Sequence, residues 1–178
     1  MKKLLTIGCI AVAVIACSKQ SNPQPAVLNS FNSFGCSVNG ISLVPCVTGN
    51  NSSPQALSTS FTQLNSTHAN LTIIAQNHCD GNFRIGRYFT IRFDSVVLKR
   101  DSTYKLSDFS ANIHSTVACE YSEDLYYYSS DSSLAGSLII ESLNLDKRTI
   151  SGTLQATLKR IQDEQKVEVT LCTFNLRY

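Results

Sequence analysis

The sequence predicts an all-β fold, either an antiparallel β-sandwich or a flattened β-barrel of about nine strands. Short segments alternate apolar and polar residues with a period of two, which is the pattern of strands that bury one face. Turns rich in glycine, asparagine and aspartate separate these segments at intervals of about 8–12 residues. No stretch keeps a helical period of about 3.6 residues over several turns. We therefore expect one β-rich domain over residues 34–178.

The first predicted strands form a hairpin. Residues 34–38 and 41–47 flank Asn39-Gly40, a dipeptide that tolerates the positive φ angles of a tight hairpin turn. This turn places Cys36 opposite Leu43.

The central part of the chain predicts two longer strands. A loop over residues 48–55 and a short strand over 57–64 precede them, and the two strands cover 70–76 and 83–98. Their apolar residues fall on alternate positions and should face the core: Leu71, Ile73, Ala75, Phe89, Ile91 and Phe93. The intervening Thr90, Arg92 and Asp94 should face outward.

A tyrosine-rich segment follows the strand expected over residues 112–121. If residues 125–129 form a strand, alternation sends Leu125 and Tyr127 to the core and Tyr126 and Tyr128 outward. With Tyr121, the two outward tyrosines predict a possible binding surface. The alternative is cross-strand packing that only stabilises the sheet.

The last strands form a second hairpin and then change phase. Residues 137–143 and 149–161 flank a turn at 144–148. In the final strand, residues 166–178, the apolar residues first occupy odd positions to Leu171 and then even positions from Phe174. A β-bulge near Cys172 would restore one continuous apolar face; the alternative is a strand buried on both faces.

The N-terminus reads as a lipoprotein signal peptide over residues 1–16. Two lysines precede an apolar run that is too short to span a bilayer as a helix. The run ends in Val14-Ile15-Ala16-Cys17, which resembles the lipobox of bacterial lipoproteins, so Cys17 is the expected lipidation site. The alternative is an ordinary secretory signal with a chance cysteine. Residues 17–33 then form the lipidated cysteine and a flexible polar tether.

Charge and composition narrow the possible partners. Lys2 and Lys3 account for the net charge of +2, so the mature chain is formally neutral. No basic stripe exists to neutralise phosphates, which argues against a nucleic-acid partner. No motif predicts a cofactor.

Several strand-and-turn motifs carry a resemblance. They are Val38-Asn39-Gly40, Leu71-x-Ile73-x-Ala75, Gly136-Ser137-Leu138-Ile139-Ile140, Ile150-Ser151-Gly152-Thr153-Leu154 and Val167-x-Val169-Thr170-x-Cys172-x-Phe174. In this order, over residues 34–178, they resemble a family of uncharacterised Bacteroidota lipoproteins built around one β-rich domain. The resemblance implies a fold and a location, and it implies no activity.

Five cysteines remain after Cys17: Cys36, Cys46, Cys79, Cys119 and Cys172. Export to an oxidising compartment predicts at least one disulfide, and we favour Cys79–Cys119; the alternative is five buried thiols. The sequence has no C-x-x-C motif, and consecutive His78-Cys79-Asp80 cannot converge easily on one ion. No metal site is predicted.

Catalytic motifs are weak. The chain lacks a G-x-S-x-G elbow. The acidic residues Glu120, Glu123, Asp124 and Glu141 could in principle serve a glycan-acting hydrolase, or be solvated charge on strand faces. Asp94-Ser95-Val96 and Asp101-Ser102-Thr103 resemble an O-glycosylation acceptor, with ordinary turn chemistry as the alternative.

These observations predict a lipid-anchored cell-envelope protein. They favour a non-enzymatic binding or structural module over an enzyme. The alternatives are an envelope or glycan-acting hydrolase and a barrel that binds a small apolar ligand. Expected partners are the membrane, through the lipid anchor, and an envelope protein or glycan. Lys19-Gln20 is followed by no acidic cluster, which favours the periplasmic side of the outer membrane over the cell surface.

Overall fold

The computed structural model describes residues 32–47, 55–79, 86–108 and 115–178. The predicted signal peptide, Cys17, most of the predicted tether and the predicted loop after residue 47 lie outside them, as do His114 and Asp80. Within the described residues twelve strands make up one sheet, compared with about nine expected, and the all-β prediction is confirmed. They are β1 (Ser33–Val38), β2 (Ile41–Leu43), β3 (Cys46–Val47), β4 (Leu57–Gln63), β5 (Ala69–His78), β6 (Arg87–Val96), β7 (Ser102–Lys105), β8 (Thr116–Glu123), β9 (Tyr126–Ser129), β10 (Gly136–Asn144), β11 (Thr149–Arg160) and β12 (Lys166–Arg177).

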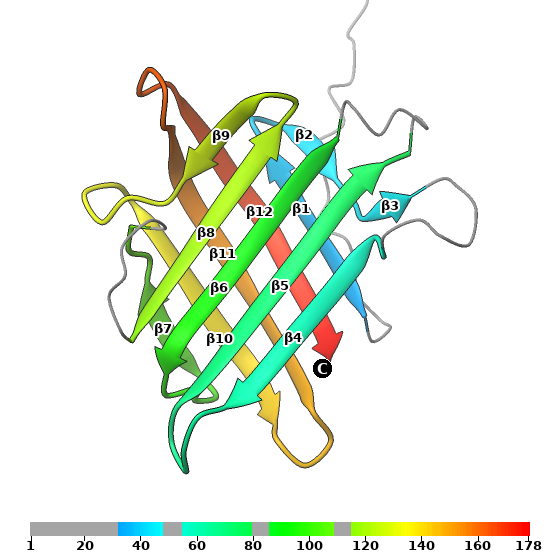
Figure 1. The fold of residues 1–178 in the computed structure, drawn as a ribbon, viewed down its shortest axis with the longest axis vertical. Coiled ribbons are helices and arrows are strands. Elements are labelled where there is room, and N and C mark those ends of the chain that lie inside the picture. Colours follow the sequence, from blue (N-terminus) through cyan, green and yellow to red (C-terminus); the bar gives the residue numbers. More distant parts are fainter. Residues whose placement is uncertain (1–31, 48–54, 80–85, 109–114) are drawn as a thin grey trace, which may run out of the picture.

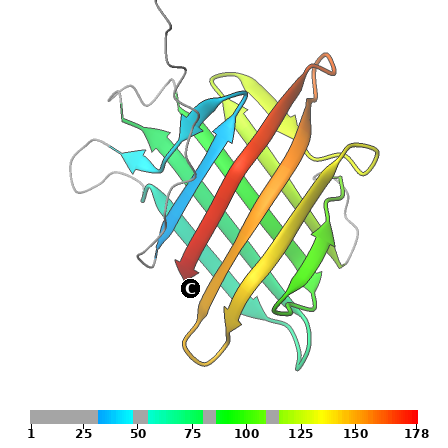
Figure 2. The same cartoon turned by 180° about the vertical axis from the view of Figure 1, so that it is seen from behind.

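The sheet folds over into two layers. One layer holds β4, β5, β6, β8 and β9, and the other holds β2, β1, β12, β11, β10 and β7 (Figures 1 and 2). The layers join where β9 pairs with the end of β11, and again where Leu106 forms a bridge to Val117 of β8. Among the described residues no strand pairing joins β4 to β1 or β2, so the flattened barrel stays open on that side. There the ring of Phe61 packs against Tyr178, with 4.4 Å between centroids.

Both predicted hairpins are confirmed. Val38 pairs with Ile41 across the Asn39-Gly40 turn, and Cys36 lies opposite Leu43 as expected. Gly40 and Asn39 both have positive φ angles, 79° and 48°. The second hairpin joins β10 to β11, where residues 144 and 149 are paired.

The predicted strand over residues 41–47 is split in two. Pro45 has no N–H group, so a regular ladder with β1 cannot continue past Leu43. The chain then joins the other layer, where β3 pairs with β5 in parallel. This pairing and the Leu106–Val117 bridge are parallel, and they depart from the all-antiparallel arrangement that we expected.

The core lies between the layers and follows the predicted alternation. The expected inward residues of β5 and β6 are fully buried: Leu71, Ile73, Ala75, Phe89, Ile91 and Phe93. Facing residues of the other layer, including Leu154, Leu158 and Phe174, complete one continuous cluster. The burial of these apolar side chains is the main favourable term in folding.

A β-bulge in β12 resolves the change of phase. Leu154 pairs with Cys172 and Ala156 pairs with Val169, so one residue of β11 faces two residues of β12. Leu171 takes a positive φ of 51° and points outward with 42% of its surface exposed. The bulge keeps Val169 and Cys172 on the buried face, which confirms the bulge and excludes the alternative of a strand buried on both faces.

The prediction for the tyrosine-rich segment is confirmed for Tyr126, which is half-exposed, and wrong for Leu125, Tyr127 and Tyr128. Asp124 and Leu125 form the turn between the paired residues Glu123 and Tyr126, so β9 starts one residue later than expected. Leu125 is 83% exposed in this turn, and Tyr127 points outward. Tyr128, expected outside, is buried.

The preferred disulfide is also wrong, although one disulfide is present. Cys79 is bonded to Cys46, with 5.4 Å between their Cα atoms. The parallel pairing of β3 with β5 sets Cys46 beside Asn77 and so brings the two cysteines together at the end of β5. Cys119 instead lies in the middle of β8 with its thiol in the core.

Candidate functional site

The outward face of β10, β11 and β12 carries two adjoining hollows. Their volumes are about 260 and 440 Å³, and they share Ser137 and Gln155, so we treat them as one groove, called here the β10–β12 groove. Its lining residues are Ala135, Gly136, Ser137, Ile139, Thr153, Leu154, Gln155, Ala156, Thr157, Glu168, Val169, Thr170, Leu171, Cys172 and Thr173. A groove on a paired three-stranded sheet offers a rigid platform for a ligand.

Strand alternation explains which side chains reach the groove. In β11, Leu154 and Ala156 are buried, and so Gln155 and Thr157 face outward. Gly136 of β10 and Ala135, the residue before it, also line this hollow. The bulge in β12 bends that strand at the same level, which adds to the hollow.

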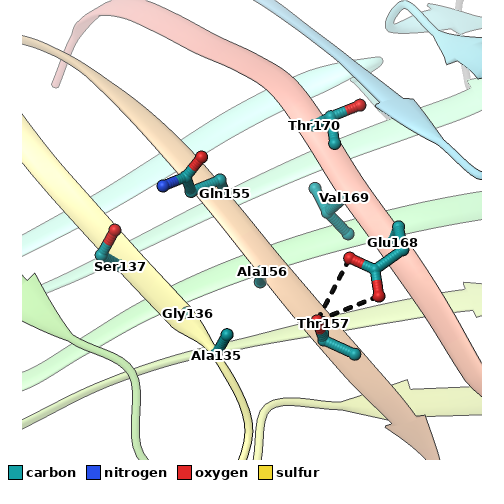
Figure 3. A pocket seen from close by; sticks show the side chains of 9 residues that line it. All are labelled: Ala135, Gly136, Ser137, Gln155, Ala156, Thr157, Glu168, Val169 and Thr170. Atoms are coloured by element: carbon teal, nitrogen blue, oxygen red, sulfur yellow. Dashed lines mark hydrogen bonds between the residues drawn. The ribbon is translucent and has the colours of Figure 1, made fainter.

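One end of the groove is polar (Figure 3). The Thr157 hydroxyl lies 3.1 Å from each oxygen of the Glu168 carboxylate and donates to it. Ser137, Gln155 and Thr170 add uncharged donors and acceptors. Among the lining residues, Glu168 is the one charged group, so this end suits a neutral or cationic ligand better than an anion.

The other end of the groove is apolar. Ile139 of β10 is 39% exposed, and Leu171 of the bulge lies across β11 from it. Thr153 and Thr173 lie between them on neighbouring strands, where they are paired. A ligand that lies along the groove would therefore meet an apolar patch at one end and a carboxylate at the other.

The predicted tyrosine surface is not formed. Tyr121 and Tyr128 are cross-strand partners in the core, 5.9 Å apart between ring centroids. The Tyr121 hydroxyl donates to Glu123 at 3.0 Å, and the pKa of Tyr121 is raised, first by burial and then by this carboxylate. Arg87 completes the group with Nε 2.6 Å from the Glu123 carboxylate, and this bond raises the pKa of Arg87. These contacts favour the structural alternative.

Tyr126 is half-exposed but already has a partner. The Arg160 guanidinium lies 4.4 Å from the centroid of its ring. Arg160 also forms an ion pair with Asp163, which raises the pKa of Arg160 and lowers that of Asp163. The contacts among Tyr126, Arg160 and Asp163 hold the turn after β11 against β9, where the two layers join.

The four candidate carboxylates are divided between the two layers. Glu120 and Glu123 are three residues apart in β8, so they point to opposite faces of the sheet. Asp124 is in the turn before β9, and Glu141 is exposed on β10 in the other layer. Burial raises the pKa of Glu120, although Arg92 opposes the shift. Of the four, Glu123 already has an ionic partner, Arg87, at 2.6 Å.

The histidines and cysteines do not form a metal site within the described residues. His78 is buried, with its ring edge-on to Tyr88 at 4.8 Å, and Gly86 leaves the space that this ring occupies. His68 lies in a turn, where Nδ1 is 2.8 Å from the Thr67 hydroxyl.

The two serines of the acceptor-like motifs lie at the ends of the connection between β6 and β7. Ser95 has a positive φ of 52°, and its N–H donates to the Asn70 side chain at 2.7 Å. The Ser102 hydroxyl lies 3.4 Å from the Arg100 carbonyl. Ser95 thus lies in a bulge of β6 opposite Asn70, and Ser102 is the first residue of β7.

The sequence analysis did not predict the groove, because the alternation of apolar and polar residues along a strand identifies the buried face and not the shape of the outward face. The outward half of the same strands reads Ser137, Thr153, Gln155, Thr157 and Thr170, a run of uncharged hydrogen-bonding residues on three consecutive strands. That run was the available signal. It indicates a hydrophilic face, but it does not indicate a hollow.

Comparison with protein-family models, with curated proteins and with solved structures finds no match to this chain. The part of the chain that the structure describes contains no helix long and apolar enough to cross a membrane.

Proposed function

We propose that this chain is a lipid-anchored protein of the cell envelope and that its domain is a non-enzymatic binding module. Cys17 would carry the lipid, and the polar segment after it would hold the domain near the membrane. The ligand would lie in the β10–β12 groove. The lipobox-like N-terminus supports the anchor, and the groove supports binding.

The composition of the groove is the observation that carries this proposal. Uncharged hydrogen-bonding side chains line its length, while Glu168 and the Ile139–Leu171 patch mark its two ends. The lining holds no histidine and only one carboxyl group, so a general acid and base pair is not available there. The space between the layers is filled by the core cluster, which argues against a small apolar ligand in the interior.

A protein segment fits the groove better than a glycan. Sugar-binding faces stack rings on aromatic side chains, and none lines the groove. An extended segment with a basic side chain near Glu168 and an apolar side chain on Ile139 and Leu171 would match both ends. We therefore propose an envelope protein as the partner, reached on the periplasmic side of the outer membrane.

Retention experiments with two probes test this proposal. The purified chain is immobilised and offered detergent-solubilised envelope proteins or purified cell-wall sacculi. Thr153→Arg and Gln155→Arg fill the groove, and Thr90→Arg is the matched control on the outward face of the other layer. We expect envelope protein to be retained and the groove variants to reduce retention by about tenfold or more, a loss typical of a blocked interface centre.

Other outcomes would contradict parts of the proposal. Equal retention by the groove variants and the control would exclude the groove as the binding site. Retention of sacculi that the groove variants abolish would replace the protein partner with a glycan. Rapid digestion of the domain when intact cells are treated with proteinase would move it to the cell surface.

A further inference from the structure

Three thiols meet in the core of the described domain. Cys36 of β1, Cys172 of β12 and Cys119 of β8 are all buried, and none is bonded in the structure. All three belong to the same hydrophobic cluster. Cys46 and Cys79 form a disulfide. The domain therefore contains both oxidised cysteines and free thiols.

Cys36 and Cys172 lie on adjacent strands and face the same side. Gly35 pairs with Thr173 and Ser37 pairs with Thr170, so Cys36 is opposite the two bulge residues, Leu171 and Cys172. Leu171 points outward and Cys172 inward. Burial and then the neighbouring Cys36 thiol raise the pKa of Cys172, which indicates that the two thiols are close to each other.

This arrangement is close to that of a cross-strand disulfide. Residues directly opposite each other in antiparallel strands have Cβ atoms about 4.5–5.5 Å apart, while a disulfide needs about 3.5–4.5 Å. A bulge adjusts more easily than a regular ladder, because the extra residue is not held by a paired partner. A small movement of Cys172 toward β1 would therefore suffice.

We propose that Cys36 and Cys172 are a second disulfide site, which closes when the chain folds in the presence of a disulfide oxidant. The two thiols lose their protons and form one S–S bond. The two electrons pass to an external disulfide such as glutathione disulfide, whose S–S bond breaks to release two thiols. The inference does not depend on the function proposed for the groove.

Cys119 stays outside this pair. It is in the opposite layer, where the Ser130 hydroxyl binds the Cys119 backbone N–H at 3.0 Å. Burial raises the pKa of the Cys119 thiol and also that of Cys172, so the reactive thiolates are scarce once the core has closed. The bridge should therefore form readily during refolding and slowly in the folded protein.

The disulfide would restrain the strands that form the apolar end of the groove. It would tie the bulge of β12 to β1, and both bulge residues, Leu171 and Cys172, line the apolar end of the groove. It would also connect a strand near the start of the domain to the last strand. The Cys36–Cys172 site is thus a modification site at the floor of the groove.

Peptide mapping of the full chain tests the proposal. The chain is unfolded with reductant, refolded with reduced and oxidised glutathione, blocked with an alkylating agent and cut with trypsin. Cleavage separates residues 20–84, which contain Cys36, Cys46 and Cys79, from 106–147, which contain Cys119, and from 167–177, which contain Cys172. We expect residues 20–84 and 167–177 to be joined, and the joined product to fall about tenfold or more in C36S because its exchange partner is lost. The variant C119S should retain the product.

Native protein given the same oxidant should form the joined product much more slowly than refolding protein. If the product is missing after refolding while Cys46–Cys79 has formed, the site does not exist. Cys119 found in the bridge with either partner would overturn the assignment as well. Fragmentation of the joined wild-type peptide in the mass spectrometer distinguishes Cys36 from Cys46 and Cys79 as the partner of Cys172, so the wild-type protein decides these outcomes even if a variant fails to fold.

Discussion

At the scale of single residues, Tyr127 and Tyr128 are neighbours in β9 with opposite surroundings. Tyr127 is 45% exposed, whereas Tyr128 is 9% exposed and packs on Tyr121 in the core. We predict that Tyr128→Ala lowers the free energy of unfolding by about 3–5 kcal/mol, the usual cost of removing a buried aromatic ring. Tyr127→Ala should change it by no more than about 0.5 kcal/mol. Urea unfolding of both variants measures the difference, and equal losses would contradict the orientation described here.

Two carboxylates should give opposite pH dependences of stability. Burial raises the pKa of Glu120, so its contribution to stability is fully present below its ordinary pKa of 4.5 and is lost as pH rises through the folded value. Glu120→Gln should therefore gain stability relative to the wild type as pH rises from about 4 to 7.

Asp131 should show the opposite pH dependence of stability to Glu120. A hydrogen bond from Lys159, and then Ser133, holds the pKa of Asp131 below its ordinary 3.8, with the Lys159 ammonium 2.8 Å away. Its contribution is present above that value and is lost as pH falls through the folded pKa. Asp131→Asn should thus be less stable than wild type at neutral pH, and the deficit should shrink in acid. Thermal unfolding from about pH 3 to 8 follows both variants, and parallel curves for the two would refute the assignments.

At the scale of elements, the bulge in β12 should allow the fold to tolerate the deletion of one residue, Leu171. Removing one residue from a regular strand turns its buried face outward beyond that point. Without Leu171, however, Val167, Val169, Cys172, Phe174 and Leu176 would alternate without interruption, and the pairing with β1 and β11 would become regular. We predict that deletion of Leu171 keeps the fold and changes the free energy of unfolding by less than about 2 kcal/mol.

Deletion of Thr90 is the control for this experiment. Thr90 is in the middle of β6, where the pairing with β5 and β8 around it is regular, so its loss must expose half of a core strand. We expect that variant not to fold, as judged by circular dichroism and urea unfolding. If both deletions unfold the protein, the bulge is not an insertion into a regular strand.

Elements with a clear local pattern could be predicted from the sequence. The faces of β5, β6 and β11 and the turns at 39–40 and 144–148 follow from alternation and turn chemistry, which act between near neighbours. The predictions for β3 and β9 were wrong because one residue in each case interrupts the alternation of apolar and polar residues. Pro45 ends one ladder and sends β3 to the other layer, and the positive φ of Asp124 shifts β9 by one residue.

At the scale of the whole molecule, the pairing of distant strands decides what the surface can do. β12 lies between β1 and β11, and β9 meets β11 only at its end. Local sequence patterns do not specify such pairings, so the Cys46–Cys79 bond and the groove could not be derived from spacing alone. Their residues come from separate segments that only the two-layer arrangement brings together.

The proposed membrane anchor would be a property of the whole chain and would depend on one residue outside the described domain. The lipobox-like Val14-Ile15-Ala16-Cys17 predicts that Cys17 carries the lipid and becomes the first residue of the mature protein. Cys17→Ala should shift the protein from the detergent-rich phase to the aqueous phase or leave it unprocessed, because Cys17 is the residue that the sequence predicts to carry the lipid. Cys9→Ala, in the apolar run of the same segment, should leave partitioning unchanged. Mass spectrometry of the mature N-terminus completes the test: a lipidated Cys17 is expected, and any other first residue would remove the anchor from the proposed function without affecting the groove.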